Sequence, residues 1–280
     1  MSVESRLEWI RRRKGTITVS YCLPAGDTPW SERAACTIKS DTGIEVNLTY
    51  RIPANPSGRV PAVILLGGFL AGRRAIEYVP ESVPFAVVAL SYPYRGEVSA
   101  NPWRLMSSLP GLDRAAWHTP ASILLALDFL QAHPEVDGRR VGLVAASLGV
   151  PFGCMAAAAD HRVRALALIN GGAGLPDLVV RAAGAFGWAH EIAIPVRLAL
   201  KPILSRFEPG EYLARVSPRP VLLVNGEQDP VVPVESAKAL FESAREPKEQ
   251  RWFDVGHLSP DPARLHDLSV ELFQWLAEKI

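Results

Sequence analysis

Residues 141–149 read VGLVAASLG, and this stretch indicates the fold class more clearly than any other part of the chain. Its first five residues form an unbroken apolar run of strand length, which is typical of a strand buried on both faces. A serine framed by small residues follows at once, and residues 148–159 have a helical pattern. A buried strand that turns directly into a helix predicts a parallel sheet covered by helices.

The same alternation of buried strand and helix recurs along the chain. Short apolar runs without alternation occupy residues 62–66, 86–90, 163–169 and 221–224. Helical patterns lie at about residues 120–132, 148–159, 234–244 and 262–279. We therefore expect an α/β fold with a mostly parallel, doubly wound sheet and right-handed crossovers.

Two segments at the start of the chain depart from this order. Residues 1–30 are expected to form a helical extension, in which the basic run at residues 11–14 is the solvated end of a helix. Residues 34–52 largely alternate between apolar and polar side chains and are interrupted by turn residues at 41–43. This pattern predicts an antiparallel hairpin.

A long interval between two strands predicts an insertion. About fifty residues separate the run at 163–169 from the next strand, far more than a usual crossover needs. We interpret residues 172–212 as a small helical cap above the sheet, with helices at about 175–186 and 194–205. The alternative is a long ordinary crossover packed on the side of the sheet. In either case residues 1–280 are expected to form one domain.

Composition excludes several classes of function. The 280 residues are 48% hydrophobic and 21% charged with a net charge of +1, which offers no basic footprint for nucleic acid or an acidic membrane. No apolar run is long enough to span a membrane, and no secretory signal is readable. The three cysteines are scattered, which argues against a disulfide framework or a zinc site. We therefore expect a cytoplasmic protein.

Ser147 is the expected nucleophile. A turn this tight between strand and helix forces its middle residue into a strained backbone conformation and raises that side chain above the sheet edge. The positions two before and two after must be small, and they are Ala145 and Gly149. The positive end of the following helix favours negative charge beside the serine.

A serine hydroxyl needs a base, and His257 is the best of the six histidines. It follows a short strand at residues 251–253, so it lies at the carboxyl edge of the sheet, where such folds bind ligands. Asp229 follows another buried strand and is the expected acid that orients the imidazole, with Glu227 as a close rival. The order serine, acid, histidine is that of the α/β-hydrolases.

The remaining site residues follow the first long parallel strand and its neighbour. Glycines at 67 and 68 would let the backbone approach an acyl group, so the amides of Phe69 and Leu148 are the expected oxyanion donors. No metal or organic cofactor is implied. The expected substrate contacts are Gly68, Leu70, Tyr94, Arg95 and Trp188.

These motifs resemble the α/β-hydrolase superfamily over most of residues 34–280. Residues 133–172, with the Pro-Arg-Pro at 218–220, are similar to the dienelactone-hydrolase-like branch and to the catalytic domains of acyl-CoA thioesterases and bile-acid acyltransferases. The chain departs from that pattern in three places. Ser147 stands where dienelactone hydrolases and the bile-acid transferases have cysteine, Ala145 stands for glycine, and Leu66 stands for the histidine of the oxyanion loop.

The resemblance and the residues together imply a serine hydrolase that cleaves carboxylic esters through an acyl-enzyme. An acyl-CoA thioesterase or acyltransferase is the alternative, for which the pair Arg73-Arg74 is the nearest cationic feature. A non-catalytic binding module of the same fold is an alternative of another class, and it predicts a missing triad member. The expected partner is a small-molecule ester or thioester. The sequence does not decide between a monomer and a homodimer.

Overall fold

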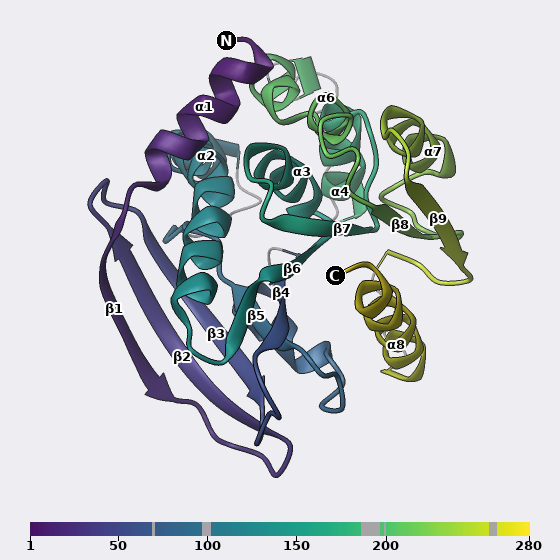
Figure 1. The fold of residues 1–280 in the computed structure, drawn as a ribbon. Coiled ribbons are helices and arrows are strands. Elements are labelled where there is room, and N and C mark those ends of the chain that lie inside the picture. Colours follow the sequence, from purple (N-terminus) through teal and green to yellow (C-terminus); the bar gives the residue numbers. More distant parts are fainter. Residues whose placement is uncertain (69–70, 97–101, 186–196, 199, 258–261) are drawn as a thin grey trace.

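A computed structural model describes residues 1–280 except 69–70, 97–101, 186–196, 199 and 258–261 (Figure 1). Within the described residues nine strands form one sheet in the order β1-β2-β3-β5-β4-β6-β7-β8-β9. The pairs β1-β2, β2-β3 and β3-β5 are antiparallel. All pairs from β5-β4 onward in this order are parallel. The strands are β1 (Ile17–Pro24), β2 (Ser31–Ser40), β3 (Glu45–Pro53), β4 (Val60–Leu66), β5 (Ala86–Leu90), β6 (Val136–Ala146), β7 (Val163–Ile169), β8 (Val221–Gly226) and β9 (Lys248–Phe253).

Helices cover both faces of the parallel part of the sheet. Helices α1, α2 and α3 pack on one face, and η1 and α8 pack on the other (Figure 1). The helices are α1 (Val3–Lys14), α2 (Pro102–Ala132), α3 (Gly149–Ala159), α4 (Leu175–Ala185), α6 (Pro209–Leu213), α7 (Val234–Ser243) and α8 (Pro262–Lys279), with the 3-10 helices η1 (Gly72–Tyr78) and η2 (Ser205–Phe207).

This two-sided burial explains the unbroken apolar runs. In β4, Ala62 and Ile64 join the core cluster beneath α2 and α3, whereas Val63 and Leu65 join the cluster beneath α8. Because successive side chains point to opposite faces, a strand covered on both sides must be apolar at every position. The predicted doubly wound sheet and the hairpin of β2 and β3 are therefore confirmed.

Two boundaries differ from the sequence-based expectation. Helix α2 begins at Pro102, well before residue 120, and it contains Pro110 and Pro120. Proline favours the first turn of a helix, which is why Pro120 resembled a start. The helical extension expected over residues 1–30 ends at Lys14, and residues 17–24 form the edge strand β1.

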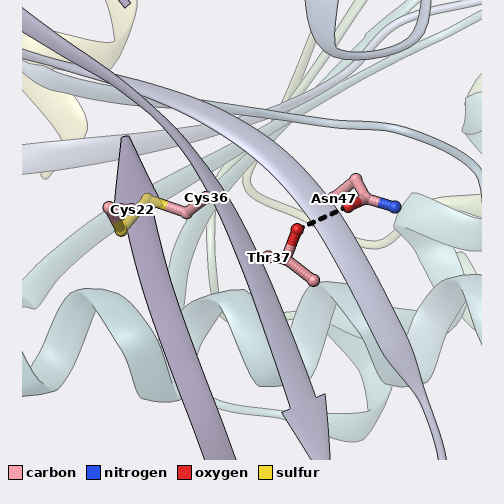
Figure 2. Close-up of a disulfide and its surroundings, with 4 residues drawn as sticks. All are labelled: Cys22, Cys36, Thr37 and Asn47. Atoms are coloured by element: carbon pink, nitrogen blue, oxygen red, sulfur yellow. Dashed lines mark hydrogen bonds between the residues drawn. A yellow bond between two sulfur atoms is a disulfide. The ribbon is translucent and has the colours of Figure 1, made fainter. Parts of the chain in front are cut away.

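The expectation that the cysteines form no disulfide was wrong. Figure 2 shows Cys22 of β1 and Cys36 of β2 joined side by side, next to the hydrogen bond between Thr37 and Asn47. The antiparallel ladder sets the two cysteines directly opposite each other, with their Cα atoms 4.1 Å apart. Because β1 was not expected to be a strand, this pairing could not be anticipated. Cys154 is buried in α3 as a free thiol.

The disulfide removes the argument on which a cytoplasmic location rested, since disulfides form mainly in oxidising compartments. The cytoplasmic location therefore stays a prediction, and the cysteines no longer support it. None of the helices in the described part of the chain is both long and apolar enough to cross a bilayer.

The predicted insertion is described only in part. Its first helix is α4, and residues 200–204 of the second are helical, while most of the segment between them lies outside the described residues. Whether it acts as a cap stays a prediction.

Reduction of the disulfide is expected to destabilise the chain. The bond joins residues with a sequence separation of 14, for which the chain-entropy model gives up to about 3 kcal/mol. Urea unfolding with and without a reductant measures the change. Cys22→Ser is the control, because Cys22 is exposed and its replacement removes only the bond, so a reductant should have no further effect. An identical unfolding midpoint for oxidised and reduced wild type would contradict the expectation.

Candidate active site

Ser147 lies in the turn between β6 and α3 with a left-handed backbone. Its φ is 52°, a region that few residues other than glycine enter. The turn is held from both sides, because the Ser147 amide donates to the carbonyl of Ile169 at 2.8 Å and its own carbonyl accepts from the Val150 amide at 3.0 Å. The strained conformation expected from the sequence is therefore present.

Close backbone contacts explain the small residues around the turn. A Cβ on Gly149 would lie 2.7 Å from the carbonyl oxygen of Leu66 on β4. The position of Ala145 is different, since it carries a methyl where related folds have glycine. A Cβ on Gly153, one turn further along α3, would lie 2.5 Å from the Cβ of Ala145. Gly153 therefore leaves the space that the methyl group of Ala145 occupies.

Three side chains from the ends of three strands form a continuous hydrogen-bonded row. The Oγ atom of Ser147 lies 2.7 Å from Nε2 of His257, and Nδ1 of His257 lies 2.7 Å from Oδ2 of Asp229. A carboxylate can only accept, so Nδ1 must carry the proton toward Asp229. Nε2 is then free to accept the proton of the serine hydroxyl.

The carboxylate of Asp229 is fixed independently of the imidazole. Its Oδ1 atom accepts hydrogen bonds from the amides of Val231 and Val232, both at 2.8 Å, and its side chain is only 1% exposed. Glu227, the rival acid, is exposed on the same loop, and its backbone amide donates to the carbonyl of Phe253 at 2.8 Å. The geometry favours Asp229.

The loop that carries Asp229 packs tightly on the loop that carries His257. A Cβ on Gly226 would lie 2.3 Å from the carbonyl oxygen of Val255, which explains the glycine at the end of β8. The Gln228 amide donates to the same carbonyl at 3.3 Å, and its side chain donates to Asp254 at 2.6 Å. The acid and the base are therefore held in register by their own backbones.

The other described histidines either pack against aromatic side chains or are exposed to solvent. His118 stacks on Trp9, and His133 packs against Tyr50; burial lowers the pKa of both imidazoles. His161 and His266 are exposed, and His190 lies outside the described residues.

The expected oxyanion loop is described only in part. A Cβ on Gly68 would lie 4.0 Å from the Cβ of Ser147, so this loop borders the serine. Leu148 directly follows the serine and is 43% exposed. Phe69, Leu70 and Trp188 lie outside the described residues, and their roles stay predictions.

Tyr92 supports this loop, a role that its place after β5 did not reveal. Its hydroxyl donates to the carbonyl of Gly67 at 2.7 Å. Burial raises the pKa of Tyr92 far above its usual value, so the phenol stays neutral and keeps its proton for this bond. A tyrosine just after β5, at the same edge of the sheet as the Gly67-Gly68 loop that follows β4, was the available signal.

The structure shows other neighbours for Tyr94 and Arg95, the two remaining predicted substrate contacts after β5. The ring of Tyr94 lies against Gly96 and Gly111. Arg95 is 78% exposed and pairs with Glu45 at 2.6 Å. Their contact with a substrate stays a prediction. Among the described residues, no three His, Cys, Asp or Glu side chains are grouped as a metal ion would require.

Comparisons with known proteins show similarity to one family over part of the chain. Residues 125–192 match the profile of the family described as BAAT / Acyl-CoA thioester hydrolase C terminal. This segment contains Ser147 but neither Asp229 nor His257, and it covers well under half of the chain. No curated protein matches the sequence.

Several solved structures are similar over nearly the whole chain. Acetyl xylan esterase 1 from a Thermoanaerobacterium species shares 18% identity over 98% of this chain and 94% of that chain, with a TM-score of 0.71. Acetyl xylan esterase from a Paenibacillus species shares 15% over 99% and 94%, with a TM-score of 0.72. A cold-adapted esterase from an Arctic intertidal metagenomic library shares 19% over 91% and 96%, with a TM-score of 0.61. At such identities the likeness concerns the fold, and the chain has the α/β-hydrolase fold expected from the sequence.

Replacing Gly153 by alanine is expected to destabilise the fold, although alanine is the better helix former. Two methyl groups would be forced to within 2.5 Å, and overpacking of this kind typically costs about 1–3 kcal/mol. Urea unfolding measures the loss. The exchanged pair Ala145→Gly with Gly153→Ala keeps one methyl group in the same space and should recover most of the stability. A Gly153→Ala chain more stable than wild type would contradict the contact.

Proposed function

We propose that the chain is a serine hydrolase that cleaves carboxylic esters through an acyl-enzyme. The observation that carries the proposal is the hydrogen-bonded row from Ser147 through His257 to Asp229, with both links at 2.7 Å. The three residues come from distant parts of the sequence and occur in hydrolase order. A non-catalytic binding module would have no need for a complete and connected row.

The proposed first step forms the acyl-enzyme. The Oγ atom of Ser147 attacks the ester carbonyl carbon while Nε2 of His257 takes the hydroxyl proton, and Asp229 stabilises the imidazolium that results. The negative charge on the carbonyl oxygen lies at the start of α3, where the Leu148 amide and the positive helix end are the proposed stabilising groups. The imidazolium then gives its proton to the departing alkoxide, and the alcohol leaves.

The second step releases the acid. Water attacks the acyl carbon, His257 takes a proton from it, and the tetrahedral intermediate collapses when His257 returns that proton to Oγ. The product is a carboxylic acid, and Ser147 is regenerated. The names of the structural neighbours, two acetyl xylan esterases and a cold-adapted esterase, support ester chemistry on this fold.

An acyl-CoA thioesterase or acyltransferase is the second candidate. The family match over residues 125–192 favours it, because that family is described by acyl-CoA thioester hydrolysis. Arg73 and Arg74 lie just past the oxyanion loop and are exposed, as a contact for coenzyme phosphates would require. The two candidates share the same acyl-enzyme and differ in the leaving group.

A substrate panel tests the proposal. Nitrophenyl esters of rising acyl length and acyl-CoA thioesters of the same acyl groups should be hydrolysed by wild type, with the higher kcat/KM on the esters. Ser147→Ala should lose about 10⁶-fold in kcat, as in comparable triads. Ser57→Ala, at an exposed serine that precedes β4, is the matched control and should retain full activity. Full activity of Ser147→Ala would refute the assignment, and higher kcat/KM on the thioesters would favour the second candidate.

The acid is tested by a pair of matched amide substitutions. Asp229→Asn should lower kcat on the order of 10⁴-fold, because an amide donor facing Nδ1 favours the wrong tautomer of His257. Glu227→Gln changes an exposed side chain two residues away and should have little effect. Steady-state kinetics on one nitrophenyl ester measures both. The reverse ranking of the two variants would exchange their roles.

A further inference from the structure

Asn170 occupies the turn directly after β7, between the strand that leads to Ser147 and the strand that leads to Asp229. Its backbone is left-handed, with a φ of 50°, and its amide donates to the carbonyl of Val224 at 2.8 Å. Asparagine tolerates this conformation better than most residues. The main chain therefore fixes where the Asn170 side chain begins.

Both ends of the side-chain amide of Asn170 are bonded to the loops of the triad. Its Nδ2 atom donates to the backbone carbonyl of His257, and its Oδ1 atom accepts from the amide of Gly226 at 3.3 Å. The first bond needs a donor and the second an acceptor, so a primary amide satisfies both while a carboxylate satisfies only the second.

These bonds fix the base at a point that the triad itself does not reach. The imidazole of His257 is held through its ring nitrogens, to Ser147 and to Asp229. Its backbone lies in a loop beyond the last residue of β9, and Asn170 ties the carbonyl of that loop to the end of β8. Together with the backbone contacts between the two loops, this side chain fixes the distance between the backbone of the base and the strand that carries the acid.

We propose that Asn170 is a positioning residue for His257, an inference that rests on the hydrolase function proposed above. Its described side-chain hydrogen bonds go to backbone atoms of His257 and Gly226, so it acts through the base. It keeps Nε2 within reach of Ser147 while the imidazole gains and loses a proton. A displacement of about 1 Å in such a group can cost about 100-fold in rate, so the contribution is measurable.

Asn170→Gly tests the side chain without disturbing the backbone, because glycine adopts the left-handed conformation freely. We expect kcat on a nitrophenyl ester to fall about 10–100-fold with KM little changed. Labelling of Ser147 by a fluorophosphonate should slow by a similar factor. The matched control is Asn55→Gly, which makes the same change at an exposed asparagine with a φ of 51° and should keep wild-type kcat.

A structural role alone would give a different result. If Asn170 only stabilised the fold, the melting temperature would fall while kcat per folded molecule stayed at the wild-type value. That outcome, or a kcat within about two-fold of wild type, would overturn the proposal.

Asn170→Asp separates the two bonds of the side chain. The carboxylate keeps the acceptor for Gly226 but removes the donor to His257, so kcat should fall about as far as in Asn170→Gly. If positioning matters, this loss persists on the high-pH plateau of kcat; recovery of the wild-type plateau would overturn the proposal.

Ser147→Ala in the same assay keeps this inference apart from the proposed function. An active Ser147→Ala chain would refute the hydrolase assignment itself. An inactive Ser147→Ala chain together with a fully active Asn170→Gly chain would refute only the role of Asn170.

Discussion

The left-handed backbone of Ser147 is the constraint on which the surrounding structure depends. A residue other than glycine in this region costs about 1–3 kcal/mol, so its neighbours must hold it there. The carbonyl of Ile169 does so from β7, and α3, whose residues are all buried, does so from beneath. Close approach to β4 then requires Gly149. The result is a hydroxyl that points away from the sheet at the edge where β8 and the loop after β9 bring their own side chains.

Most of the fold could be predicted because strands buried on both faces are apolar at every position, and this pattern is visible in the sequence. Strands such as β4 have no polar position, and no other secondary structure of that length explains this pattern. Strand β1 left a weaker record, since it lies at the edge of the sheet outside the core. The alternation of Val19, Tyr21 and Leu23 was the available signal for this strand. Without a strand predicted here, Cys22 had no predicted disulfide partner. The start of α2 was missed because its internal prolines resembled boundaries.

The sequence places Asp229 ahead of Glu227 as the acid, although both follow the same strand. The structure favours Asp229 on two grounds: its Oδ2 atom lies 2.7 Å from Nδ1 of His257, and its side chain is nearly inaccessible and bonded to two amides, whereas Glu227 is exposed. Supporting residues were less visible. Tyr92 and Asn170 act on backbone carbonyls of distant loops, and a sequence does not reveal which carbonyl a side chain will reach. The three predicted residues in undescribed segments remain predictions.

The close contact between Ala145 and Gly153 also limits which pairs of residues these two positions can hold. A glycine at position 145 needs no change at position 153, whereas an alanine at position 153 needs the glycine at position 145 first. Losing the methyl from position 145 first leaves a small void that a core can tolerate, whereas gaining one at 153 first creates a clash between strand and helix. The two orders therefore differ in the stability of their intermediate, so the residue tolerated at position 153 depends on the residue at position 145. The glycine in the middle of α3 is thus required by the alanine near the end of β6.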